Sequence, residues 1–145
     1  MTLPDMSSPA EMNASEPHSR TRDDHAAERA EDYVEAIAEL SNGGDGCRVG
    51  ELATHFGVSH VTVTRTVARL VREGLAQTEP YRPVRLTAAG AELAKRSRQR
   101  HETVLAFLRA IGVSASQAAV DAEGIEHHVS DETLRRMRAV IRERS

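Results

Sequence analysis

The chain has 145 residues, of which 39% are hydrophobic and 3% aromatic, and its formal net charge is −3. This length suits one compact domain or two small ones that share a core, and a core of Ala, Val, Leu and Ile favours helices. A membrane-spanning protein is excluded because no apolar run approaches the ~20 residues that cross a bilayer. The single Cys47 excludes an internal disulfide, which fits a reducing cytoplasm.

Charge is distributed unevenly along the chain. Residues 46–87 carry six Arg against three Glu, whereas residues 121–132 carry five acidic residues and neither Lys nor Arg. The first segment is therefore suited to a polyanion and the second to a cation.

The N-terminal part combines a polar tail with a helix. Residues 1–22 are rich in proline and small polar residues and are expected to form a disordered tail. A helix is predicted from Asp23 to Ser41, because apolar residues recur at helical spacing at Ala30, Tyr33, Val34, Ile37 and Leu40. Asp32 and Glu35 lie one turn apart and opposite this stripe. They either face solvent or supply oxygen ligands to a second structural unit.

Two short helices joined by a tight turn follow a glycine-rich loop at residues 41–46. The first is predicted at Val49–Phe56, with Gly57 in its C-terminal cap, and the second runs from His60 to Glu73 after Ser59 as N-cap. The second helix is expected to bury Val63, Val67, Leu70 and Val71. Its other faces carry small polar and Arg side chains, which is the helix-turn-helix pattern of DNA-binding proteins.

A basic hairpin follows this predicted recognition helix. Leu75–Glu79 and Val84–Thr87 are predicted as two short strands around a proline-containing turn at residues 80–83. A hairpin in this place is a wing, and its Tyr81 and Arg82 can reach a phosphate or a groove.

Three more helices are predicted in the C-terminal part. A long helix, Ala88–Ile111, is capped by Thr87 and has His101 at the edge of its apolar stripe, which comprises Leu93, Val104, Phe107, Leu108 and Ile111. Taken alone, His101 fits an ordinary core-edge histidine. A short helix, Ser116–His128, precedes a final helix that Ser130 caps. The stripe of the final helix packs within or between subunits and comprises Leu134, Met137, Val140 and Ile141.

The short helix carries Glu123, Glu126 and His127 at positions i, i+3 and i+4. On a helix these three side chains project from one face, within reach of a single ion. Carboxylate and imidazole donors without thiolates suit Mn²⁺ or Fe²⁺. Alone, the same residues also fit a solvated acidic helix end with surface histidines.

Three separated motifs resemble the diphtheria-toxin-repressor family, in particular its manganese transport regulators. They are Glu31-Asp32-Tyr33-Val34-Glu35, Arg100-His101-Glu102 and residues 121–130, and the match spans about residues 23–142. The resemblance implies a cytoplasmic homodimer that is mainly α-helical with a small β-hairpin. A winged helix-turn-helix domain is expected at residues 23–87 and a helical dimerisation and metal-binding domain at residues 88–145. With Mn²⁺ bound, such a protein is expected to bind double-stranded operator DNA and repress metal-uptake genes.

The resemblance also implies the functional residues. The expected metal ligands are Asp32, Glu35, His101, Glu123, Glu126 and His127. The iron-responsive branch has Met in place of Asp32 and Cys in place of Glu123, so this set of oxygen and nitrogen donors should favour Mn²⁺ over Fe²⁺ or Co²⁺. One or two ions per subunit remain open. Expected DNA contacts are Ser59, Val61, Thr62, Thr64 and Arg65 in a groove and Arg69, Tyr81 and Arg82 at phosphates.

Two other functions fit part of the pattern. A carboxylate-bridged dimetal enzyme built on a helical bundle normally uses two Glu-x-x-His motifs, and only one related motif is present here. A winged-helix transcription factor that responds to iron, or that binds DNA independently of metal, is the other alternative.

Overall fold

The computed structural model describes the backbone of residues 16–145 and the side chains of Arg22 and residues 24–145. The helices are α1 (Glu16–Ser41), α2 (Val49–Phe56), α3 (His60–Arg72), α4 (Ala88–Ala110), α5 (Ala115–Ile125) and α6 (Asp131–Arg144), with a short 3₁₀ helix, η1 (Glu126–His128), before α6. Strands β1 (Ala76–Gln77) and β2 (Arg85–Leu86) form an antiparallel hairpin. The predicted fold class, mainly helical with a small hairpin, is confirmed.

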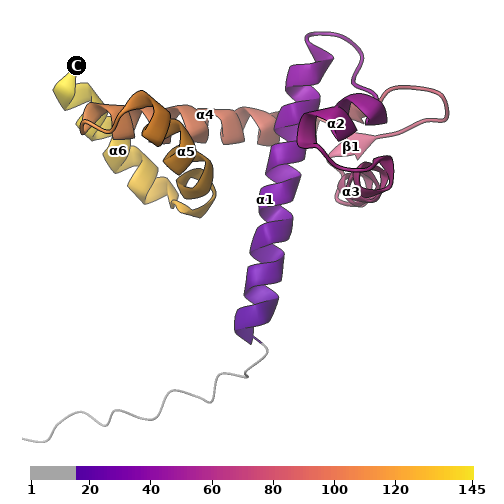
Figure 1. Cartoon of the computed structure of the whole chain (residues 1–145), viewed down its shortest axis with the longest axis horizontal. Coiled ribbons are helices and arrows are strands. Elements are labelled where there is room, and N and C mark those ends of the chain that lie inside the picture. The colour runs from indigo at the N-terminus through magenta and orange to yellow at the C-terminus, as the bar shows by residue number, and fades with distance from the viewer. Residues whose placement is uncertain (1–15) are drawn as a thin grey trace, which may run out of the picture.

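The molecule is elongated, and α4 joins its two ends (Figure 1). One end consists of α2, α3 and the hairpin, and the other consists of α5 and α6, while α1 crosses α4 between them. Each end has its own hydrophobic core. The described residues contain no helix that is both long and apolar enough to cross a membrane.

Helix α1 begins at Glu16, earlier than the predicted start at Asp23. Residues 16–22, which were predicted to belong to a disordered tail, therefore form the first turns of this helix. Pro17 lies in the first turn, where a missing backbone N–H breaks no intrahelical hydrogen bond, so this proline does not terminate the helix. The rest of the predicted tail, residues 1–15, lies outside the described residues.

The N-terminal core forms where α1, α2, α3 and the hairpin meet. Val34, Ile37, Leu52, Val63 and Leu70 are fully or almost fully buried there. Each of these large side chains removes enough apolar surface from water to stabilise the fold by about 1.5–3 kcal/mol. This core joins α1 to α2 and the hairpin, and α2 and the hairpin in turn contact α3.

Local signals predicted the start and end of several helices correctly. The hydroxyl of Ser59 accepts a hydrogen bond from the backbone N–H of Thr62 (3.1 Å) and caps α3. Gly57 ends α2 in the left-handed conformation, with φ of +64°. Thr87 and Ser130 cap α4 and α6 in the same way as Ser59 caps α3.

The buried stripe of α3 differs from the prediction at one position. Val71 is 38% exposed, and Thr66 is buried instead. Residues 63, 66, 67 and 70 follow the spacing i, i+3, i+4 and i+7, so Val71 lies about 90° from the centre of their stripe. The stripe is therefore as wide as predicted but is displaced around the helix toward Thr66.

The wing is shorter than predicted, with two residues in each strand. An isolated bridge between Cys47 and Val84 extends the pairing toward α2. Tyr81 at the tip is fully exposed and has φ of +65°, which is consistent with a tight turn.

The start of α4 is packed tightly against the hairpin. A Cβ atom at Gly90 would lie 2.0 Å from the backbone oxygen of Leu75, so only glycine allows this approach. The hydroxyl of Thr87 also donates a hydrogen bond to the backbone oxygen of Gly74 (2.7 Å). These contacts attach α4 directly to the winged-helix unit.

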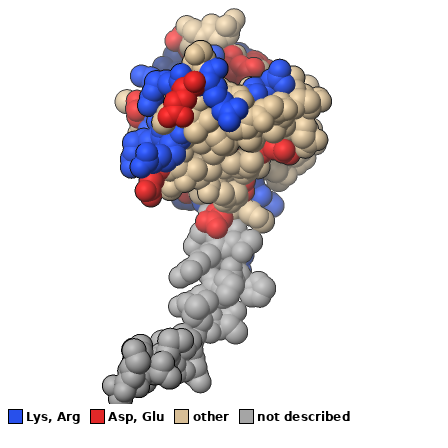
Figure 2. All heavy atoms as spheres, turned by 90° about the vertical axis from the view of Figure 1, so that its left-hand side faces the viewer, with Lys and Arg blue, Asp and Glu red and all other residues tan. Residues whose placement is uncertain are grey.

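The C-terminal core is smaller and consists of Val104, Leu108, Ala118, Ala122 and Leu134. Ile111, predicted to be buried, is 47% exposed because α4 ends at Ala110 and Ile111 lies in its C-terminal cap. Figure 2 shows this end of the molecule, where an uncharged surface is bordered by Lys and Arg side chains with Asp and Glu side chains among them.

Candidate metal centre

The six predicted ligands come from four elements. Helix α1 provides Asp32 and Glu35, α4 provides His101, α5 provides Glu123, and η1 provides Glu126 and His127. These elements meet where α1 crosses α4 (Figure 1). Donors from the first helix and from the last third of the chain thus approach one another.

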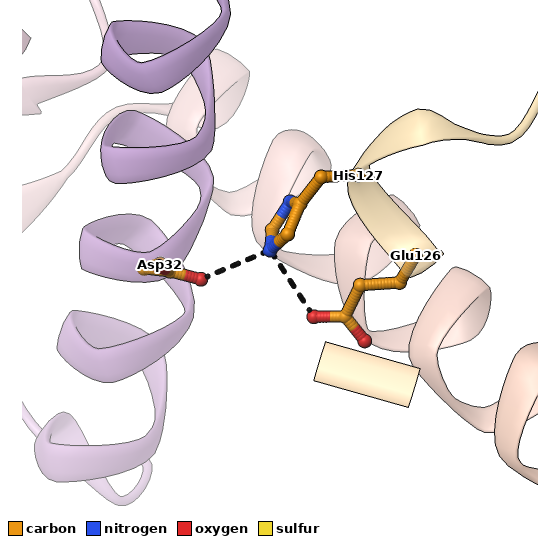
Figure 3. Close-up of side chains that lie close together, drawn as sticks. All are labelled: Asp32, Glu126 and His127. Atoms are coloured by element: carbon orange, nitrogen blue, oxygen red, sulfur yellow. Dashed lines mark ion pairs between the residues drawn. The ribbon is translucent and has the colours of Figure 1, made fainter. Parts of the chain in front are cut away.

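Asp32, Glu126 and His127 form the first cluster (Figure 3). His127 Nε2 lies 3.4 Å from Asp32 Oδ1 and 3.3 Å from Glu126 Oε1. One donor atom from each residue lies within 4.8 Å of the other two, which is close enough for a single ion to be shared. This cluster joins α1 to η1.

A second cluster combines His101, Glu123 and Glu126, whose donor atoms also lie within 4.8 Å of one another. His101 Nδ1 forms a hydrogen bond with Glu126 Oε2. Glu126 therefore belongs to both clusters, with one carboxylate oxygen directed to each histidine. Its side chain is almost completely buried, at 2% exposure.

Glu35 belongs to neither three-residue cluster but lies beside the second one. It lines a groove of about 600 Å³ together with His101 and Glu123. The structure therefore brings five of the predicted ligands into two clusters and places Glu35 at their border.

The acidic–histidine motif does not lie on one helical face as predicted. Helix α5 ends at Ile125, and residues 126–128 continue as a 3₁₀ helix. The tighter 3₁₀ turn changes the direction of the side chains. Glu123 consequently joins the cluster with His101, whereas His127 joins the cluster with Asp32.

Burial changes the proton affinity of these groups. It raises the pKa of Asp32, and the nearby carboxylate of Glu123 adds to this effect. Burial likewise raises the pKa of Glu126 and of Glu35, while hydrogen bonds from His101 and Ser97, respectively, oppose the increase. Without a cation, closely spaced carboxylates therefore hold protons more tightly than usual.

His127 shows the balance of opposing effects. Burial disfavours its protonated form, but the hydrogen bond with Glu31 and the negative charge of Asp32 outweigh burial and raise its pKa. A cation has to compete with this proton, because imidazole coordinates metal in its neutral form.

Two residues next to predicted ligands were missed by sequence reasoning. Glu31 Oε2 lies 2.7 Å from His127 Nδ1, and Glu31 Oε1 lies 3.4 Å from Arg100 Nη1. Both residues belong to the motifs that carry the family resemblance, but neither was given a role from the sequence. His128, which had no predicted role, lies 3.5 Å from Glu28 of α1 and contributes to neither cluster.

The donor chemistry fits a divalent cation of intermediate hardness. Four carboxylates and two imidazoles surround the crossing of α1 and α4, and no thiolate takes part in either described cluster. Oxygen donors with imidazole suit Mn²⁺, Fe²⁺ or Co²⁺. Glu126 can serve either one ion or a close pair.

The predicted DNA contacts lie on the outer surface of α3 and the wing. The exposed residues are Ser59, Val61, Thr62, Thr64, Arg65, Tyr81 and Arg82, whereas Arg69 is half-buried and forms an ion pair with Glu73. Ser59 and Thr62 also bond each other through their hydroxyls (3.0 Å), so the helix cap occupies part of their hydrogen-bonding capacity.

Comparison with known proteins gives two family matches. The family described as "Iron dependent repressor, N-terminal DNA binding domain" matches residues 25–84, and "Iron dependent repressor, metal binding and dimerisation domain" matches residues 87–144. The transcriptional regulator MntR of Escherichia coli O6:H1 is 45% identical over 115 residues, covering 79% of this chain and 74% of that protein. The HTH-type transcriptional regulator MntR of Lysinibacillus sphaericus is 38% identical over 111 residues, covering 77% and 80%.

Solved structures give the same result. The manganese regulator SloR matches with a TM-score of 0.68 at 28% identity, covering 78% of this chain and 53% of that chain. A manganese-dependent transcriptional repressor in complex with manganese matches with a TM-score of 0.67 at 29% identity, covering 77% and 52%. The chain thus spans about half the length of these two proteins.

Proposed function

The chain belongs to the iron-dependent repressor family, and on this basis we propose that it is a manganese-responsive transcriptional repressor of metal-uptake genes. This family consists of transcriptional regulators rather than enzymes, which removes the dimetal enzyme as an alternative. The resemblance to the diphtheria-toxin-repressor family and its manganese branch is confirmed. The proposed ligands are Asp32, Glu35, His101, Glu123, Glu126 and His127.

One observation supports the proposal more than any other. Asp32 belongs to the helix that forms the core of the DNA-binding unit, and its carboxylate lies 3.4 Å from His127 of the C-terminal unit. A cation held by these residues would therefore bridge the part that reads DNA and the part that dimerises.

The residues of the centre suggest how metal controls DNA binding. Carboxylates of α1 and η1 repel each other and loosen the contact between the two units. When bound, Mn²⁺ supplies positive charge that cancels this repulsion. Asp32 and Glu35 then hold α1 in place, and the shared core transmits this restraint to α3. In a homodimer, the restraint fixes the distance between two recognition helices, which must match about one turn of DNA, ~34 Å, or a multiple of it.

The proposed DNA contacts divide into two kinds. Arg65 can bind guanine through two hydrogen bonds, and Val61 or the methyl group of a threonine can contact thymine. Arg69, Tyr81 and Arg82 are the proposed contacts to phosphates, which position the protein but do not specify sequence.

The homodimer is supported by the uncharged surface of the C-terminal unit (Figure 2). Val120 is an exposed apolar residue of this unit, and pairing with a second copy would cover such residues. A protein that binds operator DNA as a dimer acts at the chromosome, so we place it in the cytoplasm.

Manganese is proposed over iron because Asp32 and Glu123 provide oxygen donors where the iron-responsive branch has sulfur. Fe²⁺ and Co²⁺ are expected to bind more weakly as effectors. An iron-responsive regulator is the alternative, and the metal ranking in solution decides between them.

The test is operator binding by the full chain. DNA from upstream of its own gene is titrated in the presence of Mn²⁺, Fe²⁺, Co²⁺ or chelator, with binding measured by gel shift and calorimetry. Mn²⁺ should tighten binding, and DNA should tighten Mn²⁺ binding by the same factor. Equal operator affinity with Mn²⁺ and with chelator would refute the proposal and favour a metal-independent regulator.

A further inference from the structure

A chain of charged contacts lies behind the first metal cluster. His127 Nδ1 and Glu31 Oε2 are 2.7 Å apart, and Glu31 Oε1 is 3.4 Å from Arg100 Nη1. The side chains of His127, Glu31 and Arg100 are 4%, 17% and 24% exposed, respectively. Because these side chains are largely shielded from water, the contacts between them are stronger than ion pairs at the surface.

The contact with Glu31 determines which nitrogen of His127 can bind metal. An ionised carboxylate accepts hydrogen bonds and cannot donate them, so the Nδ1 atom of the neutral imidazole must carry the proton. Nε2 is then left with a free lone pair. This is the atom that faces Asp32 and Glu126, at 3.4 and 3.3 Å.

Arg100 has an environment that is unusual for a charged residue. Its Nε atom is buried and has no hydrogen-bond partner among the described residues. Burial of an arginine is costly unless a carboxylate compensates its charge. The partner here is Glu31, which comes from a helix 69 positions earlier in the chain.

These contacts connect three separate elements. Glu31 immediately precedes Asp32 on α1, Arg100 immediately precedes His101 on α4, and His127 lies on η1. Each member is therefore a proposed ligand or the neighbour of one. A substitution of Glu31 or Arg100 should therefore change the metal affinity of the centre without removing any of the proposed donor atoms.

We propose that Glu31 and Arg100 are positioning residues for the metal centre: Arg100 fixes Glu31, and Glu31 holds His127 with Nε2 directed at the cation. This inference rests on the proposed function for the identity of the ion but not for the geometry. Outer residues that orient a ligating histidine typically contribute 10–100-fold to metal affinity.

The variants separate orientation from charge. Glu31→Leu removes both acceptor oxygens, whereas Glu31→Gln removes the charge and keeps one acceptor oxygen, which can serve His127 while the amide nitrogen takes the place of the oxygen that faces Arg100. Arg100→Leu removes the group that holds Glu31. Glu28→Gln is the matched control for Glu31→Gln, because it also removes one negative charge of α1 that acts on Asp32 but its side chain pairs with His128 and not with His127.

A second control matches the arginine. Arg98→Leu removes a guanidinium from α4 whose side chain is 80% exposed, pairs with Glu102 and borders the groove that Glu35 lines. It should leave the tautomer of His127 unchanged.

Two measurements are made on the full chain. The first is the tautomer of His127 in the metal-free protein, from long-range ¹⁵N–¹H NMR at a pH where the ring is neutral, with the signal assigned by its loss in His127→Asn. The second is Mn²⁺ affinity by calorimetry. We expect the Nδ1–H tautomer in the wild type, in Glu31→Gln and in both controls, and a shift toward Nε2–H in Glu31→Leu.

Mn²⁺ affinity should fall by about 10–100-fold in Glu31→Leu, and by less in Glu31→Gln and Arg100→Leu. Each control should lose less Mn²⁺ affinity than the variant that it matches. If Glu31→Leu fails to fold, the proposal is tested by the Mn²⁺ affinities of Glu31→Gln and Arg100→Leu. Each of them must be lower than the affinity of its control.

The proposal is overturned if the wild-type ring is the Nε2–H tautomer, or if Glu31→Leu and Glu28→Gln bind Mn²⁺ equally. Failure of the proposed function looks different, because the wild type would then not bind Mn²⁺ while the tautomer would still respond to Glu31. A purely structural role would lower the unfolding free energy of the variants without changing the tautomer.

Discussion

Replacing Glu126 by glutamine should have opposite effects on the metal-free and the metal-loaded protein. Glu126 lies between the two clusters and is almost completely buried. Glu126→Gln preserves the shape of the side chain and can still exchange hydrogen bonds with His101 and His127. It removes the charge that both clusters share.

The size of the effect on the metal-free protein follows from the distances. Donor oxygens of Asp32 and of Glu123 each lie within 4.8 Å of a Glu126 oxygen. With an effective dielectric constant of about 20, each pair repels by about 3.5 kcal/mol. The two histidines and partial protonation offset much of this repulsion. We therefore expect a net gain of about 1–3 kcal/mol in the unfolding free energy, or roughly 3–10 °C in Tm.

The effect with metal has the opposite sign. At a Mn²⁺ concentration 100 times its Kd, binding stabilises the wild type by about 2.7 kcal/mol. Loss of a shared ligand should weaken binding at least as much as loss of an outer-sphere partner, which costs ~10–100-fold. After a 100-fold loss, the same concentration stabilises the variant by only about 0.4 kcal/mol.

Urea unfolding followed by circular dichroism, at one protein concentration and pH 7.5, measures both quantities when it is run with EDTA and with Mn²⁺. Glu102→Gln is the control, because Glu102 is an exposed residue of α4 that pairs with Arg98. Its effect should stay within about 0.5 kcal/mol in both conditions. The reasoning is refuted if Glu126→Gln is less stable than the wild type in EDTA, or if Mn²⁺ stabilises both equally.

The other predictions concern acidity, metal choice and DNA. The raised pKa values of Asp32, Glu126 and His127 mean that the folded metal-free protein binds more protons than the unfolded chain, so its stability is highest in mild acid and is lost as pH rises through these pKa values. Unfolding in EDTA should therefore be easier at pH 8 than at pH 5.5, and a flat profile would contradict this. Mn²⁺ affinity should change the other way and fall with acidity in calorimetry, because protons compete for the same donors. Asp32→Met should reduce the preference for Mn²⁺ over Fe²⁺ and Co²⁺ in competition binding; an unchanged ranking removes Asp32 from the selectivity argument. Arg65→Ala should cost about 1–3 kcal/mol on the specific operator and relax its sequence preference, whereas Arg82→Ala should weaken all sequences alike, as titration of matched and scrambled DNA would reveal.

Features determined by a few neighbouring residues were predictable from the sequence. The caps at Ser59, Thr87 and Ser130 and the left-handed Gly57 depend on hydrogen bonds within one helical turn. Hydrophobic spacing likewise predicted the helices themselves. It failed at Val71 and Ile111, because burial at a helix edge or end depends on whether another element covers that position.

For the candidate metal centre, the sequence predicted which residue types lie close together but not how they are arranged. Spacing within residues 123–127 suggested one shared helical face, and the transition to a 3₁₀ turn after Ile125 divided that set between two clusters. Contacts across large sequence separations, such as Glu31 with His127, 96 positions apart, have no periodic signal. Such contacts can be identified only from the three-dimensional arrangement of α1, α4 and η1.

Because α4 is packed tightly against the hairpin at Gly90, it is a rigid link between the two ends of the molecule. Its 23 residues extend about 34 Å, at 1.5 Å per residue. Tilting a rod of this length by 5° displaces its far end by about 3 Å, close to the ~3.4 Å spacing of successive base pairs. Because the glycine leaves no slack at the hairpin, the proposed metal centre would need to move its ligands only slightly to shift α3 by a distance comparable to the base-pair spacing.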